Sequence, residues 1–190
     1  MIIGICGTHG TGKSTVLQGL KNAGVPVSEI QISRTAQSIL GWDKLSRAEE
    51  SEENMWKLQD AIISIMEDRD SAILKSQIQT VVERTPADVW AYTTIWCDRL
   101  GINPNTHAKA VLYKQKCIEL AKQYEKFIII PAAADITFVA EANRADAKSR
   151  EDVAKIITTF LAHSRFNYRT IASVLPDARV NEALLFIKGL

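Results

Sequence analysis

Short apolar runs alternate along the chain with longer stretches in which apolar residues recur every three or four positions. Such runs are typical of strands buried on both faces, and the longer spacing is typical of amphipathic helices. The pattern predicts strands at residues 2–6, 26–32, 78–82, 127–130 and 171–175. It predicts helices at 54–75, 106–124, 153–161 and 179–188, and one more that begins at Lys13 and stops near Gly24. The polar, acidic stretch 41–53 is expected to form a loop or a weak helix.

Strands separated by helices pair in parallel through right-handed crossovers. We therefore expect an α/β fold, a three-layer α/β/α sandwich around a parallel sheet of about five strands. The 190 residues contain no internal repeat and no linker rich in Pro, Gly or Ser. Their number suits one compact unit, so a single domain over residues 1–190 is predicted.

The first apolar run leads into a glycine-rich sequence that matches the Walker A pattern G-x-x-x-x-G-K-[ST]. Its residues are Gly7, Thr8, His9, Gly10, Thr11, Gly12, Lys13 and Ser14, with Thr15 following. Glycines let successive N–H groups point at one phosphate, and the helix that begins near Lys13 adds its positive dipole end. Lys13 can reach the β and γ phosphates, while the Ser14 hydroxyl can ligate Mg²⁺. A site for ATP and Mg²⁺ is therefore predicted over residues 7–15.

The Walker A sequence alone does not separate kinases from ATPases and GTPases. The chain has no N-K-x-D sequence, which disfavours guanine recognition of the GTPase kind. A helicase or a large motor would need more chain for a second subdomain. A length of 190 residues therefore favours a small kinase.

A second constellation, E-R-T-P-A-D-V-W-A-Y, starts at Glu83, directly after the third predicted strand. In an open parallel sheet, ligands bind at the carboxyl edge of the strands. Glu83 could accept a proton from an attacking hydroxyl or hold the water shell of the metal. Arg84 could grip a substrate phosphate or the transferring group. The structural alternative is a surface Glu–Arg pair at the end of a strand.

With these motifs the chain resembles the small P-loop nucleoside and nucleotide kinases. In particular it is similar to the kinase-like AAA ATPases that resemble the nicotinamide riboside kinase domain of bacterial NAD regulators. The likeness rests on three blocks. They are G-T-H-G-T-G-K-S-T at 7–15, the block at 83–92, which is similar to D-R-[ST]-x-x-D-x-x-A-Y, and E-A-N-R at 141–144 with Arg150 downstream. The second block is also similar to the E-R-S of deoxynucleoside kinases, in which the acid is the general base.

The resemblance implies a P-loop NTPase fold with catalytic roles for Lys13, Glu83, Arg84, Arg144 and Arg150. Glu83 and Ser14 would also serve the metal. The third block is similar to the family's D-G-x-R segment ahead of a lid arginine, so a lid is expected at 141–152. Its cations would close over the triphosphate and neutralise developing charge. The resemblance favours Arg144 and Arg150 over Lys148, and the alternative for these residues is a solvated helix start.

The candidate acceptor pocket combines Arg34, Trp56, Gln59 and Tyr92. Arg34 follows the second predicted strand, at the edge of the crevice. Deoxynucleoside kinases offer an aromatic residue and a Gln to the base from a helix at the place of 54–75. An indole can stack on a base and an amide can pair with its edge. Core packing is the alternative for Trp56, and Tyr92 could bind the acceptor or only support the third strand.

Charge and composition narrow the choice of acceptor. The 23 Lys and Arg nearly balance the 22 Asp and Glu, for a net charge of +1. That balance gives no broad basic face for duplex DNA, although Lys109, Lys114, Lys116, Lys122 and Lys126 could form a local stripe. The leading hypothesis is an ATP- and Mg²⁺-dependent phosphotransferase acting on a nucleoside or nucleoside monophosphate. A kinase of polynucleotides or modified bases, and a nucleotide-sensing module, stay open as alternatives.

The same composition bears on location and partners. No apolar run approaches the roughly 20 residues that span a bilayer, and no signal peptide is expected at the N-terminus. Three cysteines without a C-x-x-C pair fit a reducing compartment, so a cytoplasmic location is expected. The sequence leaves a homodimer open.

Overall fold

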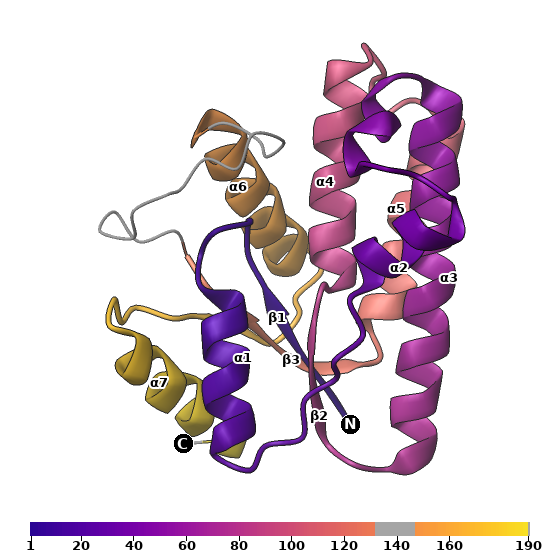
Figure 1. Ribbon diagram of the computed structural model, residues 1–190. Coiled ribbons are helices and arrows are strands. Elements are labelled where there is room, and N and C mark those ends of the chain that lie inside the picture. Colours follow the sequence, from indigo (N-terminus) through magenta and orange to yellow (C-terminus); the bar gives the residue numbers. More distant parts are fainter. Residues whose placement is uncertain (132–146, 190) are drawn as a thin grey trace.

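A four-stranded parallel sheet forms the centre of the computed structural model, which describes residues 1–131 and 147–189 (Figure 1). Its strands are β1 (Ile2–Cys6), β2 (Thr80–Glu83), β3 (Tyr124–Ile129) and β4 (Tyr168–Thr170), in the order β2-β1-β3-β4. The parallel α/β fold predicted from the sequence is confirmed, with four strands in the described residues where about five were expected.

Helices cover both faces of this sheet. They are α1 (Lys13–Asn22), α2 (Ile32–Ile39), α3 (Glu52–Ser76), α4 (Pro86–Arg99), α5 (Ala108–Ala121), α6 (Ala147–His163) and α7 (Pro176–Lys188), with a 3₁₀ turn at Leu45–Glu49. Successive side chains of β1 alternate between two hydrophobic clusters. Ile3 and Ile5 pack with α1 and α7, whereas Ile2 and Cys6 pack with the cluster that α3 to α6 complete. The result is the expected three-layer sandwich (Figure 1).

The predicted strands at 26–32 and 171–175 are wrong. In the first, only Val27 pairs with β2, as an isolated bridge to Val81, and Ile32 already begins α2. A helix at this place buries both Ile32 and Ala36 on one face, which favours it over a longer strand. The fourth strand of the sheet, β4, ends at Thr170, because the Glu182 carboxylate accepts the N–H groups of residues 172 and 173.

The sequence pattern did not predict α4, which follows β2 directly. Thr85 is its N-cap, Pro86 stands in its first turn, and Asp88 completes a capping box with Thr85. The signal is T-P-A-D, a cap residue, a proline at the first helical position and an acid two residues later. This helix places Asp88 and Tyr92, one turn apart, beside the end of β1.

The remaining features concern thiols and membranes. Cys6, Cys97 and Cys117 are free and buried, and burial raises the pKa of the Cys97 thiol to about 11. Among the described residues, none of the helices has the length and apolar character needed to cross a bilayer.

Candidate active site

The glycine-rich loop runs from the end of β1 to the start of α1. Gly10 and Gly12 have φ of +68° and +86°, and Gly12 is the left-handed N-cap of α1. Gly7 has φ of +144°, and a Cβ atom there would lie 2.5 Å from the carbonyl oxygen of Ile130. Glycine is therefore required at the point where the chain leaves the sheet, which fixes where the loop begins.

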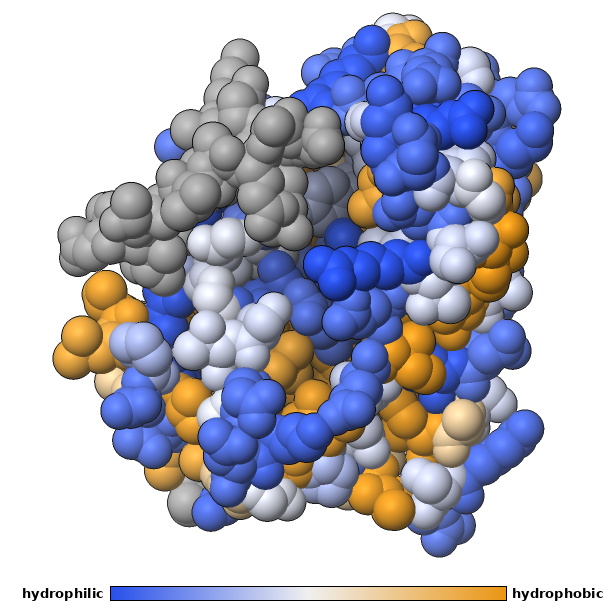
Figure 2. Space-filling model, viewed as in Figure 1, coloured by the Kyte–Doolittle hydropathy of each residue, from blue (hydrophilic) through white to orange (hydrophobic). Residues whose placement is uncertain are grey.

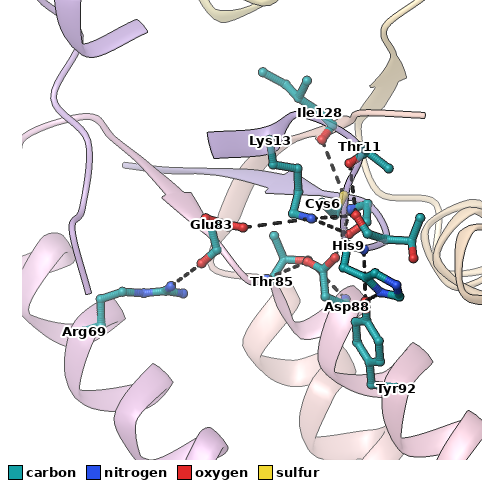
Figure 3. A network of polar contacts seen from close by, with 12 residues as sticks. Cys6, His9, Thr11, Lys13, Arg69, Glu83, Thr85, Asp88, Tyr92 and Ile128 are labelled. Atoms are coloured by element: carbon teal, nitrogen blue, oxygen red, sulfur yellow. Dashed lines mark hydrogen bonds and ion pairs between the residues drawn. The ribbon is translucent and has the colours of Figure 1, made fainter. Parts of the chain in front are cut away.

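Lys13 reaches back across this loop from the first turn of α1. Its ammonium donates to the carbonyl oxygens of Gly7 and Thr8, at 2.9 and 2.8 Å (Figure 3). The Glu83 carboxylate lies 3.9 Å from the same nitrogen. Burial lowers the pKa of Lys13, and the nearby carboxylates of Asp88 and Glu83 oppose that shift. The lysine is thus a largely enclosed cation with two carboxylates facing it.

Glu83 stands at the carboxyl end of β2, and the parallel register pairs it with Ile5 of β1. That register brings the acid level with the end of the strand that carries the P-loop. The Glu83 side chain is 40% exposed, compared with 11% for Lys13, so the carboxylate faces solvent as well as the ammonium. In the view of Figure 2, the surface is hollowed between α1 and α2, and hydrophilic residues line the hollow.

Asp88 joins the loop to the turn after β2. One of its carboxylate oxygens accepts the N–H of Gly7 at 2.9 Å, and the other accepts the N–H and the hydroxyl of Thr85, each at 2.8 Å. The residue is 1% exposed. A buried carboxylate satisfied by backbone donors on two segments fixes their relative position. The sequence analysis did not single it out, although its capping box was a readable signal.

Tyr92 lies one turn beyond Asp88 and meets the loop at His9. The His9 N–H donates to the Tyr92 hydroxyl at 3.2 Å, and the His9 ring nitrogen lies 3.3 Å from the same oxygen. The Arg84 guanidinium stacks over the Tyr92 ring, 4.8 Å from its centroid. The structure therefore brings together Lys13, Glu83, Arg84 and Tyr92, all of which the sequence proposed as site residues.

Similarity to known proteins agrees with this geometry. A family model described as an AAA domain matches residues 3–93. The structure titled "Crystal structure of NadR protein in complex with NR" superposes with a TM-score of 0.72 at 12% identity, over 100% of this chain and 52% of that one. Deoxyadenosine kinase from M. mycoides with bound dATP also gives 0.72, at 14% identity, over 99% of this chain and 100% of that one. The chain has a P-loop nucleoside kinase-like fold.

One further solved structure resembles the chain over its whole length. Deoxyadenosine kinase from M. mycoides with the products dCMP and dCDP superposes with a TM-score of 0.64 at 13% identity. The chain thus spans the whole of that kinase but only about half of the NadR protein. No curated protein matches the sequence.

In this kinase-like fold, a buried arginine of α7 supports the P-loop from the side opposite to Asp88. Arg179 is 2% exposed and donates to the carbonyl oxygen of Thr11 at 2.7 Å. It also donates to the carbonyls of Ser173 at 2.9 Å and Pro131 at 3.4 Å. Sequence reasoning missed Arg179, because a single arginine in an amphipathic helix carries no pattern of its own.

Of the candidate acceptor residues other than Tyr92, two are buried between helices and one is exposed. Trp56 is 5% exposed and stacks on His107, while Gln59 is 1% exposed and accepts from the Tyr113 hydroxyl at 3.0 Å. Both thus lie in the interface between α3 and α5, which is the core packing left open for Trp56. Arg34 is exposed in the first turn of α2. The part of these residues in binding an acceptor stays a prediction.

The expected lid falls partly outside the described residues. Arg144 and the stretch 141–146 belong to the part of the chain that the structure does not describe. Arg150 lies in α6, and its Nη2 donates to the carbonyl oxygen of Gly10 at 3.4 Å. The amino-terminal part of α6 therefore contacts the P-loop, and the lid itself stays a prediction.

The residues of the P-loop fit a magnesium ion. Ser14 is exposed in the first turn of α1, and Glu83 supplies a carboxylate nearby, so the donors are the hard oxygens that Mg²⁺ prefers. Within residues 1–131 and 147–189, no group of three or more His, Cys, Asp or Glu forms a metal site by itself. Magnesium in kinase sites is typically held by one or two protein ligands together with substrate phosphates.

Substituting Gly7 tests how strictly the loop requires its first glycine. We expect Gly7→Ala to lower stability by about 1–3 kcal/mol and to abolish nucleotide binding, because the backbone strain adds to a clash with Ile130. Gly24→Ala is the matched control, with φ of +82° but no atom within 4 Å of the added Cβ. Calorimetric binding of ATP and thermal melting distinguish the two. Full nucleotide affinity in Gly7→Ala would contradict the loop assignment.

Proposed function

We propose that the protein is an ATP- and Mg²⁺-dependent phosphotransferase whose acceptor is a nucleoside or a nucleoside monophosphate. The observation that carries the proposal is the placement of the Glu83 carboxylate 3.9 Å from the Lys13 ammonium, at the carboxyl edge of the sheet. A triphosphate held by Lys13 and a hydroxyl activated by Glu83 would then meet at one point. A nucleotide-sensing module has no need of a half-exposed acid there.

On the donor side, the loop amides and Lys13 bind the phosphates of ATP. Lys13 exchanges its hydrogen bonds to the carbonyls of Gly7 and Thr8 for bonds to phosphate oxygens. The Ser14 hydroxyl would hold the magnesium ion, which would neutralise phosphate charge. Arg150, which contacts Gly10, belongs to the lid proposed at 141–152 and contributes a further cation.

On the acceptor side, Glu83 acts as the general base when the acceptor is a nucleoside. The acceptor hydroxyl oxygen forms a bond to the γ-phosphorus as the bond from that phosphorus to the ADP oxygen breaks. The hydroxyl proton passes to the Glu83 carboxylate, and the charge on the transferring group is stabilised by Lys13 and Arg84. The stacking of Arg84 on Tyr92 holds its guanidinium at this edge of the sheet.

Four of the five lysines proposed as a nucleic-acid stripe lie close to carboxylates, and the fifth, Lys114, lies over the Trp90 ring. Lys109 pairs with Asp60 at 3.0 Å and Lys116 with Glu67 at 3.1 Å. Lys122 pairs with Glu119, and Lys126 lies 3.6 Å from Glu125. Phosphate tracking needs cations that are not already neutralised by carboxylates. The pairing of these lysines therefore disfavours a polynucleotide as acceptor. A cytoplasmic location and a homodimer both stay predictions.

A panel assay tests the proposal. The protein is incubated with ATP and Mg²⁺ and, separately, with nucleosides, nucleoside monophosphates and short oligonucleotides, and the products are analysed by mass spectrometry. We expect one phosphate to be added to a member of the first two classes, with equimolar ADP. Phosphorylation of oligonucleotides alone, or ADP release without any phosphorylated acceptor, would overturn the proposal.

A further inference from the structure

Arg69 is a buried arginine in the middle of α3 whose guanidinium contacts the chain where β2 ends. It is 2% exposed, and its Nη1 donates to the carbonyl oxygen of Glu83 at 2.7 Å (Figure 3). Nη1 and Nη2 each lie 3.4 Å from the carbonyl oxygen of Arg84. One side chain thus bridges two successive carbonyls of the turn that carries Glu83.

The turn itself has a conformation that needs support. Arg84 has φ of +62°, in the left-handed region that residues with a Cβ atom rarely adopt. Backbone strain of this kind persists only where surrounding contacts enforce it, and it concentrates at functional sites. Here both carbonyls face Arg69, while the Glu83 side chain lies toward Lys13 and Arg84 stacks on Tyr92.

Arg69 is in turn fixed by two buried partners. Its Nε donates to one Asp70 oxygen at 2.8 Å, and its Nη2 donates to the Tyr124 hydroxyl at 2.8 Å. The Tyr124 hydroxyl donates to the other Asp70 oxygen, also at 2.8 Å. The side chains of Arg69 and Asp70 are 1% and 0% exposed. A charged network this enclosed has a defined geometry, because each member satisfies the others.

We propose that Arg69 is a positioning residue for phosphoryl transfer. By bridging the carbonyls of Glu83 and Arg84 it holds the strained turn, and so aims the carboxylate at the reacting hydroxyl. Arg69 acts through the turn rather than on nucleotide or acceptor. The inference rests on the proposed function, since it assumes that Glu83 acts as the base.

The competing view is that Arg69 and Asp70 are only a buried ion pair that stabilises the core. Removing one partner of such a pair is strongly destabilising, whereas replacing both by neutral residues is often tolerated. The double variant Arg69→Met/Asp70→Asn therefore separates the two views. Tyr124→Phe is the matched control, because it removes one hydroxyl from the network and leaves the contacts of Arg69 with the turn.

We expect Arg69→Met to melt well below the wild type, and the double variant to recover most of that loss. The single-turnover rate of the double variant should nevertheless stay about 10²-fold low, the cost typical of a small misplacement of a reacting group. Its ATP affinity should be unchanged. Arg69→Lys should show the same loss of single-turnover rate and the same unchanged ATP affinity as the double variant. The reason is that an ammonium keeps the charge but cannot bridge two carbonyls while it pairs with Asp70. Tyr124→Phe should keep the wild-type rate even if it melts earlier.

A structure-based readout makes the test independent of the reaction. Amide hydrogen exchange at residues 84 and 85 should be faster in the double variant and unchanged in Tyr124→Phe. Recovery of both melting temperature and rate in the double variant would overturn the positioning role. If the wild type phosphorylates no acceptor, the proposed function fails. Amide hydrogen exchange alone then decides whether Arg69 holds the turn. Wild-type amide exchange at residues 84 and 85 in the double variant would overturn that positioning role.

Discussion

Replacing Lys13 by alanine is expected to abolish phosphoryl transfer while the fold survives. The ammonium lies against the P-loop, and its hydrogen bonds go to carbonyls of the loop rather than to the core. Removing one donor that stabilises transition-state charge costs typically 10²–10³-fold in rate. Lys13 binds both ground-state and transferring phosphates, so we expect a loss at the upper end of that range or beyond. Single-turnover kinetics with saturating ATP measure it.

The experiment needs a control for the general effect of removing a lysine. Lys21→Ala removes an exposed lysine of the same helix as Lys13, which pairs with Glu29, and it should leave the rate unchanged. Circular dichroism and melting of Lys13→Ala should match the wild type closely, because the buried carboxylate of Asp88 keeps its hydrogen bonds to Gly7 and Thr85. Near-normal turnover in Lys13→Ala would show that the donor site has been placed wrongly.

What the sequence predicted well are features encoded by local patterns. The Walker A sequence needs only eight consecutive residues, and its place between a buried strand and a helix is visible in the apolar pattern. The meeting of Lys13 and Glu83 follows from topology, because parallel strands end at the same edge of a sheet. The structure brings these two residues together across 70 positions of sequence, and the register of β1 with β2 accounts for it.

What the sequence did not predict depends on tertiary contacts. The apolar stretch at 26–32 had the composition of a strand, but only Val27 found a partner in the sheet, and the following residues gained more from helix α2. Buried charged residues are the harder case. Arg69 and Arg179 look like surface arginines in amphipathic helices, and only the fold shows that both are 2% exposed and bound to backbone carbonyls beside the P-loop.

The spacing of Trp56 and Gln59 shows the limit of arguing from a helix face. Residues three apart lie on neighbouring faces, and the sequence offered both to an acceptor base. In the structure that face of α3 packs on α5, where Trp56 meets His107 and Gln59 meets Tyr113. The helix period identifies a shared face but not the element that covers it.

Replacing Glu83 by glutamine is expected to slow the chemical step and to leave folding and donor binding largely intact. Glutamine keeps the shape of the side chain and removes the base. Loss of a positioned base costs typically 10²–10⁴-fold in rate, or about 3–5 kcal/mol of barrier. ATP affinity should change much less, because Lys13 and the loop amides supply most of the binding. The stability effect should be within about 1 kcal/mol, since the side chain is 40% exposed and exposed ion pairs contribute little.

The structural alternative makes different predictions for the same variant. If Glu83 served only as an ion-pair partner, glutamine would lower the melting temperature and leave turnover intact. The structure places its carboxylate 3.9 Å from Lys13, a residue of the proposed donor site, and this distance is the observation behind the catalytic assignment. Glu67→Gln is the matched control, because Glu67 pairs with Lys116 on the surface of α3. Single-turnover rate, ATP affinity and melting temperature are measured for both variants. A Glu83→Gln protein that melts early but turns over normally would exclude the catalytic assignment, and the acid would then have to be sought among other residues at the same edge of the sheet.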